Sequence, residues 1–451
     1  MATRKTLSRR AFLGRAGAAG AVAALAIVPR HVVAGSPARP PSEKISIACI
    51  GIGGRGRDDL NAVGGENIVA LCDVDQRRIG DAFKKWPQAK PYRDFRQMFD
   101  EMSKSIDAVV VGTPDHTHAV AVMAALKRGK HVYCEKPLAH SIYEVRQLMK
   151  AARDREVVTQ LGNQGHSSDS IRMFCEWIGD GAIGNVHTVH AGCGMVYSKI
   201  KDLGRLKEQH DVPAGLDWDL WLGPVPFRPY HPAYVPGSWR SWLAFGTGVI
   251  GDWVCHVVDP AFWALDLGSP VTIQAEAKGY DPKLHGETCP MGTVIKYGFP
   301  ARGERGPVTL YWHDGTEKLP RPDELGPGRT VPEVGAVVLG TTGGMTYGSH
   351  GAGGVRIFPE AKMKAYQLPP KTIPRVRGHH EDWLDSIRGG RPAGSDFAAY
   401  GGPLAEIALL GVIAFRMPGK ELKWDAPAMR FTNCPEANAF INPPYRKGWT
   451  L

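Results

Sequence analysis

A glycine-rich turn that directly follows a short apolar segment constrains this chain more than any other feature. Residues 45–50 are apolar and rich in β-branched side chains, which predicts a buried strand. They run into residues 51–56, Gly-Ile-Gly-Gly-Arg-Gly. In a strand–turn–helix unit the first glycine permits the tight turn, the second lets the backbone approach a pyrophosphate, and the third lets the helix pack on the strand. The helix N-terminus then favours the anion. The pattern predicts phosphate binding at Gly51, Gly53, Gly54, Arg55 and Gly56.

A carboxylate at the end of the next strand extends this site. The apolar residues 68–72 end at Asp73, 22 residues after Gly51. An acid at this spacing can bind both ribose hydroxyls of adenosine, although a plain turn residue is the alternative. Because a carboxylate repels a 2′-phosphate, Asp73 favours NAD over NADP. Arg55 or Arg77 can offset that repulsion, so NADP stays the alternative cofactor.

Strands and helices continue to alternate as far as residue 161. Strands are predicted at residues 106–112, 131–134 and 157–161, with helices at about 119–128 and 141–153. This alternation predicts a doubly wound parallel sheet, which binds ligands at the carboxyl ends of its strands. Polar motifs stand at two such ends, residues 113–118 and 135–137.

Composition and charge exclude several classes of protein. Apolar residues make up 43% of the 451 and charged residues 22%, which excludes a disordered chain, a collagen and a coiled coil. The net charge is +10, but residues 1–34 contain six Lys and Arg and no acid, which leaves +4 for the rest. Without basic runs, that charge does not argue for nucleic acid or a membrane surface as partner. No uncharged apolar run of about 18 residues follows the N-terminus, so no membrane span is expected in the mature protein.

Residues 1–34 have the pattern of an export signal. Basic residues precede an apolar stretch from Ala16 to Val28, and residues 32–34 fit a small-residue cleavage site. Residues 8–13, Ser-Arg-Arg-Ala-Phe-Leu, resemble the twin-arginine signal, whose export machinery passes folded proteins. An ordinary secretory signal with two chance arginines is the alternative. We therefore expect a periplasmic or otherwise exported protein, with residues 35–43 as a linker.

The combined motifs resemble the glucose–fructose oxidoreductase/inositol dehydrogenase (Gfo/Idh/MocA) family. The resemblance rests on the glycine-rich turn, Cys-Asp-Val-Asp at residues 72–75, Gly-Thr-Pro at 112–114 with His118, and Glu-Lys-Pro at 135–137. It implies an α/β fold: a Rossmann doubly wound parallel sheet at residues 44–162, then a C-terminal α+β domain with an open, mostly antiparallel sheet at 163–451. It also implies that the cofactor site includes Thr113, Pro114, His118, Glu135, Lys136 and Gln164.

Lys136 is the residue that the resemblance places beside the nicotinamide. An ammonium held there can polarise a sugar hydroxyl or carbonyl oxygen. Taken alone, a lysine before a proline is more often a surface residue, and the surrounding motifs reverse that judgement.

A second motif lies around residues 246–256, a glycine-rich turn followed by Asp252 and His256. These two residues are four apart, so on a helix they share one face. His256 is suited to take a proton from a secondary alcohol, and Asp252 to orient the ring or hold the substrate. The alternative is a helix cap and a buried structural histidine. With Lys136, these two are the predicted catalytic residues.

Three further residues are candidate substrate contacts. His166 lies in a loop where many relatives carry an arginine next to the glutamine, a place that Gly165 takes here. Trp239 and Arg240 can supply a stacking surface and a hydroxyl-binding fork for a sugar, with an aromatic core cluster as the equal alternative. No metal site is expected, because no pattern supplies three or four convergent ligands.

The leading hypothesis is an exported NAD(P)-dependent oxidoreductase that transfers hydride between a sugar, polyol or glycoside carbinol and nicotinamide. Because no ready NAD pool exists outside the cytoplasm, we expect a tightly bound cofactor. A second substrate then reoxidises it, or the cycle is redox-neutral and cleaves a glycoside by oxidation, elimination and reduction. A non-catalytic sugar-binding protein is the alternative from another class. The resemblance further implies a homo-oligomer formed through the C-terminal sheet.

Overall fold

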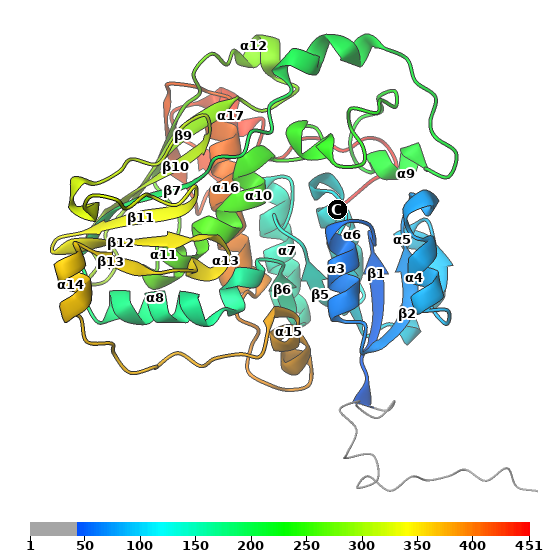
Figure 1. Cartoon of the computed structure of the whole chain (residues 1–451). Coiled ribbons are helices and arrows are strands. Elements are labelled where there is room, and N and C mark those ends of the chain that lie inside the picture. The colour runs from blue at the N-terminus through cyan, green and yellow to red at the C-terminus, as the bar shows by residue number, and fades with distance from the viewer. Residues whose placement is uncertain (1–42) are drawn as a thin grey trace, which may run out of the picture. The chain divides into compact units, whose positions relative to one another are not determined.

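The computed structural model describes residues 43–451, so the expected export signal lies outside the described residues. The part from Ile45 to Leu451 forms one compact unit that contains two sheets (Figure 1). All eight cysteines are buried within it as free thiols.

The first sheet is parallel and has six strands in the order β3-β2-β1-β4-β5-β6. Its strands are β1 Ser46–Ile50, β2 Asn67–Cys72, β3 Lys90–Tyr92, β4 Ala108–Val111, β5 His131–Cys134 and β6 Thr159–Leu161. The helices between them are α3 Arg55–Ala62, α4 Gly80–Lys85, α5 Phe95–Met102, α6 Asp115–Lys127 and α7 Ile142–Arg155. The order reverses at β1, so β2 and β4 flank the strand that carries the glycine-rich turn. This confirms the predicted doubly wound sheet.

The second sheet has nine strands in the order β13-β12-β11-β7-β10-β9-β8-β14-β15. Its strands are β7 Val186–Cys193, β8 Thr272–Glu276, β9 Gly292–Phe299, β10 Val308–Gly315, β11 Val334–Gly340, β12 Gly343–Gly348, β13 Arg356–Phe358, β14 Glu421–Asp425 and β15 Arg430–Phe431. Only the β10–β7 pair is parallel among these described strands, which confirms the expected mostly antiparallel sheet.

Helices of the C-terminal part cover one face of this sheet and connect it to the first. The longer ones are α8 Asp169–Gly179, α10 Gly248–Val257, α15 His379–Ile387 and α16 Gly402–Ala414. The shorter ones are α9 Trp218–Leu222, α11 Asp259–Ala264, α12 Pro282–His285, α13 Ser349–Ala352, α14 Glu360–Ala365 and α17 Pro435–Asn438. Helix α10 contacts β7, β10 and α16, which places its residues between the two sheets.

Helix α16 and the turn before it are apolar enough to be compared with a membrane span. Residues Phe397–Ala414 are long and apolar enough to cross a membrane, and they are the one such helical segment among residues 43–451. In the structure, 78% of this segment is buried. Its neighbours are α7, α10 and β8, so the burial is by protein and the segment serves as the central core helix of this unit.

An aromatic segment between β7 and α10 forms a small core of its own. Trp218, Trp221, Trp242 and Phe245 pack together there, separately from the cores of the two sheets. Backbone bonds join it to the first sheet, since Asp217 N donates to Val74 O at 2.9 Å. The segment therefore forms a wall next to the carboxyl ends of the parallel strands.

Candidate active site

The glycine-rich turn forms a cradle that side chains would fill. Gly51 has φ +75°, and a Cβ there would lie 2.7 Å from the backbone nitrogen of Thr113. A Cβ on Gly56 would lie 1.8 Å from the carbonyl oxygen of Gly51. Gly54 precedes helix α3, and no side chain caps that helix end. The N–H groups at the start of α3 are therefore left for a ligand, as a bound pyrophosphate requires.

A cleft of about 260 Å³ runs from this turn along the carboxyl ends of β2, β4 and β5. Its opposite wall comes from the aromatic segment between β7 and α10. The predicted residues that line it are Gly51, Gly53, Gly54, Arg55, Asp73, Thr113, Pro114, Glu135, Lys136, Trp239 and Arg240. Residues from widely separated parts of the chain thus share one cavity.

Asp73 stands at the end of β2 with a fixed carboxylate. Its two oxygens accept hydrogen bonds from Ile52 N and Asp75 N, both at 2.9 Å. Burial raises the pKa of Asp73, and these hydrogen bonds oppose that rise. Arg77 does not reach this carboxylate, because its guanidinium bonds Asp75 at 2.7 Å.

Arg78 is a cleft residue that the sequence did not single out. Its guanidinium carbon lies 3.5 Å from the position of a Cβ on Gly53, so it borders the glycine-rich turn. The available signal was the Arg77-Arg78 pair in the helical turn Gln76–Arg78 that follows β2, but the sequence does not show which of the two arginines faces the cleft.

The residues at the turn fit a dinucleotide. The glycine cradle, the carboxylate of Asp73 and the uncapped start of α3 match the pyrophosphate and ribose. The hydroxyl oxygen of Thr113 is buried without a hydrogen-bond partner among the described residues, which leaves it free to bond a ligand in the cleft. These residues would hold the adenosine and pyrophosphate of NAD.

Lys136 and Asp252 meet at the inner end of the cleft. The Lys136 ammonium donates to Asp252 Oδ1, which also accepts from Arg240 Nε at 3.1 Å. Tyr197 donates its hydroxyl to the other carboxylate oxygen at 2.7 Å. Burial acts to raise the pKa of Asp252, but the charges of Lys136 and Arg240 outweigh it and hold the pKa below its usual range. Asp252 is therefore a fixed anion that anchors two cations beside the cleft.

Asp115 is a second carboxylate in the same wall, at the start of α6. Thr247 donates to it from its hydroxyl at 2.7 Å and from its backbone nitrogen at 3.2 Å. Burial raises the pKa of Asp115 to about 7, against the effect of the Thr247 hydrogen bond and the nearby Arg240 charge. A carboxyl group with this pKa changes charge near neutral pH, next to the Lys136–Asp252 pair.

Glu135 lines the cleft, and Gln164 supports it from behind. Glu135 accepts from Gln164 Nε2 at 2.6 Å and from Arg55 Nε at 3.2 Å. Burial, and then the charge of Asp59, raise the pKa of Glu135 to about 8. Arg55 is thereby drawn toward Glu135 and Asp59, and Gln164 toward Glu135 and Tyr133.

His118 does not line the cleft. Its ring nitrogens lie 2.7 Å from the carbonyl oxygens of Thr113 and Pro137, and burial lowers its pKa to about 4. The ring thus ties the segment after β4 to the segment after β5, which positions both motifs.

His256 lies on the same helix as Asp252 but behind a second imidazole. It is 5% exposed, and its Nδ1 has no hydrogen-bond partner within residues 43–451. The ring of His350 stacks on it at 4.2 Å with an interplanar angle of 22°. Burial, and then the Lys136 charge, hold the pKa of His256 well below its ordinary value. This lowered pKa keeps the His256 ring neutral and makes it a weaker proton acceptor than an ordinary histidine.

His350 is a further residue that sequence reasoning missed. It is exposed and has φ 52°, in the left-handed region that non-glycine residues avoid. Its turn packs on Gly165, where a Cβ would lie 2.2 Å from the His350 carbonyl carbon. Gly165, directly after Gln164, thus lets the short helix α13, which carries His350, pack closely on this loop.

His166 is buried away from the cleft. Its Nδ1 lies 3.0 Å from Asp259 Oδ1, and its ring stacks on Trp263 at 4.4 Å. The structure does not bring it to Lys136 or Arg240.

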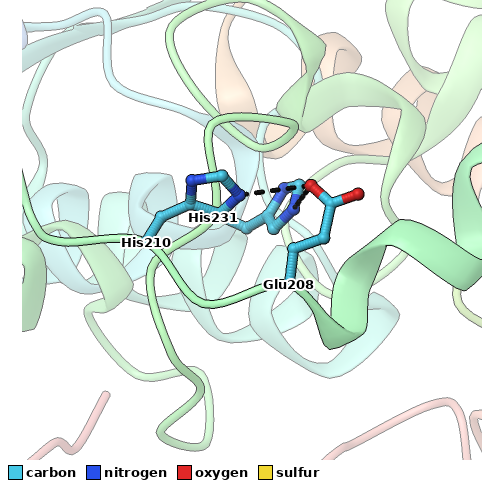
Figure 2. Close-up of side chains that lie close together, drawn as sticks. All are labelled: Glu208, His210 and His231. Atoms are coloured by element: carbon cyan, nitrogen blue, oxygen red, sulfur yellow. Dashed lines mark hydrogen bonds and ion pairs between the residues drawn. The ribbon is translucent and has the colours of Figure 1, made fainter.

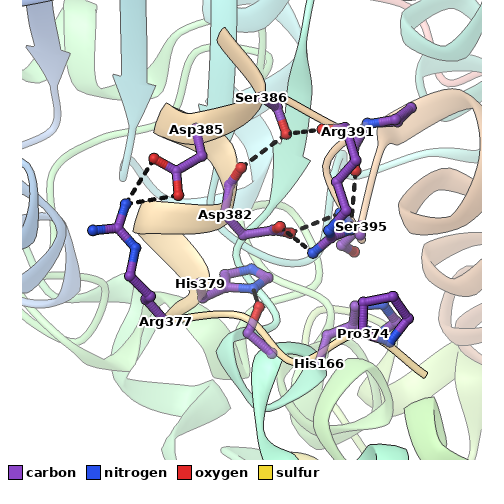
Figure 3. A network of polar contacts seen from close by, with 12 residues as sticks. His166, Pro374, Arg377, His379, Asp382, Asp385, Ser386, Arg391 and Ser395 are labelled. Atoms are coloured by element: carbon purple, nitrogen blue, oxygen red, sulfur yellow. Dashed lines mark hydrogen bonds and ion pairs between the residues drawn. The ribbon is translucent and has the colours of Figure 1, made fainter. Parts of the chain in front are cut away.

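Helix α15 holds the segment around His166 in place through His379 and Asp382, which Figure 3 shows close to it. His379 bonds Leu161 O at 2.6 Å and the Ser167 hydroxyl at 2.8 Å, so both ring nitrogens have protein partners. Asp382 accepts from Arg391 and from Gly394 N. These contacts are structural and hold the end of β6.

One group among the described residues has the spacing of metal ligands: Glu208, His210 and His231, whose ligand atoms lie within 4.8 Å of one another (Figure 2). The His231 Nδ1 accepts a hydrogen bond from Ala233 N at 3.0 Å. A neutral ring then carries its proton on Nε2, the atom that faces Glu208 at 3.6 Å. A metal ion needs a lone pair there, so this geometry favours a hydrogen-bonded cluster.

Two family patterns match the chain in order. Residues 45–163 match the oxidoreductase family, NAD-binding Rossmann fold, and residues 186–297 match its C-terminal alpha/beta domain. Together they cover about half of the chain, and they identify the first domain as an NAD-binding Rossmann domain.

Similar proteins include two curated enzymes. An inositol 2-dehydrogenase of Salmonella paratyphi B is 30% identical over 147 residues, which are 31% of this chain and 43% of the relative. A levoglucosan dehydrogenase of Pseudarthrobacter phenanthrenivorans is 32% identical over 244 residues, 53% of this chain and 52% of the relative. The chain thus spans about half the length, or less, of these relatives.

A solved structure extends the likeness of fold over most of the chain. The aldose-aldose oxidoreductase from Caulobacter crescentus, complexed with glycerol, superposes with a TM-score of 0.56 at 17% identity. The match covers 84% of this chain and 100% of that one. Both sheets therefore belong to one shared architecture.

Proposed function

Since the chain belongs to the Gfo/Idh/MocA oxidoreductase family, we propose that it is an NAD-dependent oxidoreductase that acts on a carbinol group of a sugar, polyol or glycoside. The observation that carries the proposal is the Lys136–Asp252 pair at the inner end of the cleft, with Arg240 and Tyr197 on the same carboxylate. When bound, NAD supplies the hydride acceptor or donor. The chain's own residues must bind the carbinol and move its proton.

Lys136 and its neighbours bind and polarise the substrate oxygen in this proposal. Its ammonium is held by Asp252 and lines the cleft, so it can donate to a hydroxyl or carbonyl oxygen. Arg240 presents its guanidinium over the Trp239 ring at 4.2 Å, which supports a sugar-binding fork beside an aromatic face.

We assign the proton-accepting role to His256. Its Nδ1 has no hydrogen-bond partner among the described residues, so it can receive the carbinol proton, and its lowered pKa makes it a weak base that releases the proton again readily. His350 covers it and is exposed, so we place His350 between His256 and the solvent as the group that controls access to the base.

Two further expectations accompany this proposal. We propose export through the twin-arginine pathway with NAD held tightly. We also propose a homo-oligomer formed through the outer face of the nine-stranded sheet, where the rings of His190 and Tyr311 stack at 4.8 Å and are partly exposed.

The test is substitution of Lys136. The Lys136→Ala variant should lose sugar- or polyol-dependent turnover at least 100-fold, because removing a positioned polarising group costs that order of rate. It should still bind NAD, since the glycine cradle and Asp73 are untouched. Lys150→Ala, which also removes a lysine–aspartate pair but on the exposed face of α7, is the matched control and should keep full activity.

The assay compares NADH formation with product formation over a panel of sugars, polyols and glycosides. Full activity in Lys136→Ala would refute the catalytic role assigned to Lys136. Formation of product without net NADH would favour the alternative, redox-neutral cleavage of a glycoside. Sugar binding without turnover in the wild type would favour the non-catalytic alternative.

A further inference from the structure

A second cavity, of about 250 Å³, lies on the other side of the aromatic segment from the cofactor cleft. Its wall is contributed by α6, the segment that leads into α7, α16 and the C-terminal residues 440–445. Most of this wall is apolar, including Leu243, Leu409, Val412 and Phe440. Neither the cofactor nor the substrate of the proposed function uses it.

Residues 243–247 separate the two cavities. Leu243 and Ala244 line the second cavity, whereas Thr247 donates to Asp115 in the wall of the cofactor cleft. Phe245 O accepts from the backbone nitrogen of His116 at 3.2 Å and Gly246 O from the His140 ring at 3.3 Å, which fixes this partition. A ligand in the second cavity therefore does not overlap the NAD site.

Arg416, directly after α16, is the unusual group of this cavity. Its guanidinium lies over the Phe440 ring at 4.6 Å, and no hydrogen bond or ion pair to it occurs among residues 43–451. Burial lowers its pKa, and the nearby Tyr280, Cys289 and Glu287 side chains only partly oppose that fall. Arg416 is partly exposed, so water reaches part of its guanidinium, and an anion in the cavity would supply the hydrogen-bond partner that the described residues do not.

Two other charged side chains of the wall, Arg228 and Glu144, already have hydrogen-bond or ion-pair partners. Arg228 is neutralised by Glu287 at 2.8 Å. Glu144 accepts from His140 N and Ser141 N at 2.9 and 2.8 Å, and from the Tyr445 hydroxyl. Glu144 is therefore not available to Arg416.

We propose that this second cavity binds a small carboxylate with an apolar body, whose carboxylate pairs with Arg416. A planar guanidinium donates two parallel N–H groups to a carboxylate, and the apolar wall accepts a short aliphatic or aromatic body. The cavity volume limits the body to about the size of one aromatic ring, since drug-sized pockets begin near 300 Å³.

The probe is benzoate, with benzyl alcohol as the uncharged analogue of the same shape. Binding to the purified full-length protein is measured by calorimetry in the presence of saturating NAD. Benzoate should bind, and benzyl alcohol should bind at least tenfold more weakly, because only the carboxylate forms charge-assisted hydrogen bonds with Arg416.

The variant that tests the pairing is Arg416→Gln, which should weaken benzoate binding at least tenfold. Arg128→Gln, at the exposed end of α6, is the matched control for the loss of one arginine and should bind like the wild type. If Arg416→Gln does not fold, Arg416→Lys keeps the charge without the fork and should bind benzoate severalfold more weakly.

Three results would overturn the proposal: equal affinity for benzoate and benzyl alcohol, unchanged affinity in a folded Arg416 variant, or competition between benzoate and NAD. Inorganic phosphate is the second anionic probe. Phosphate binding as tight as benzoate binding would show that charge alone is recognised, and would refute the apolar part of the proposal.

Discussion

Gly165 shows how one small residue decides what enters the site. The turn that carries His350 packs on it so closely that a Cβ would lie 2.2 Å from backbone atoms of His350. We predict that Gly165→Ala displaces this turn, uncovers His256 and lowers the free energy of unfolding by about 1–3 kcal/mol, as overpacking does. Chemical denaturation measures the effect.

Gly179→Ala is the matched control, because nothing lies within 4 Å of a Cβ at Gly179, at the end of α8. It should be as stable as the wild type or slightly more so. Equal stability of both variants would show that the His350 turn does not depend on Gly165.

Asp115 gives the site a pH dependence that can be measured. Its carboxyl has an ordinary pKa of 3.8, which burial raises to about 7. The folded protein therefore binds more protons than the unfolded chain between these values, so this group's contribution to stability is full below pH 3.8 and falls as the pH rises toward 7. The loss is at most about 4 kcal/mol.

We predict that Asp115→Asn removes this slope. Denaturation of wild type and variant at pH 5 and pH 8 should show a stability loss with rising pH that is smaller in the variant. Parallel pH profiles would contradict the assignment. The amide can still accept from Thr247, so the local hydrogen bonding is retained.

At the scale of elements, the start of α6 shows where periodicity misled the sequence prediction. The helix was expected from about residue 119, but it begins at Asp115. The expected helix left out the polar residues His116, Thr117 and His118. They lie inside the helix because other segments supply hydrogen-bond partners, such as Trp221 O for His116 at 2.8 Å.

Helix α8 depends on a buried carboxylate that holds the segment before α15. Glu176 accepts from Thr372 N and Ile373 N at 2.8 and 3.0 Å and pairs with Arg375. The hydrogen bond from Arg375 lowers the pKa of Glu176 to about 2. Its contribution to stability is therefore present above pH 4.5 and is lost as the pH falls toward 2.

Glu176→Gln should lower the free energy of unfolding at pH 7 by about 1–3 kcal/mol, because it leaves Arg375 without its anion. The difference from wild type should shrink as the pH falls toward 3, where the wild-type carboxyl begins to protonate. A constant difference across this range would mean that the pair contributes only through shape.

At the scale of the whole molecule, export and cofactor retention form one prediction. Expressed in a bacterium with the twin-arginine pathway, the chain should reach the periplasm, and the double variant Arg9→Lys, Arg10→Lys should remain in the cytoplasm. Mass spectrometry of the nucleotide released by denaturing the exported protein should find nearly stoichiometric NAD. An exported protein without nucleotide would refute the tightly bound cofactor.

The family resemblance pointed to Lys136, whereas local patterns alone predicted the parallel sheet, the glycine cradle, the Asp73 position and the shared helix face of Asp252 and His256. Each of these rests on a pattern within a few neighbouring residues, because turn sterics and strand periodicity are local. The sequence could not place His166 in the core, or Arg78 rather than Arg77 at the cleft.

Only the tertiary structure decided which distant groups meet. His350 lies over His256, Tyr197 bonds Asp252, and Arg416 lines a second cavity, although no spacing in the chain connects them. Such meetings depend on how the two sheets and the aromatic segment pack. Packing is set by the fit of many side chains together, which a local pattern does not contain.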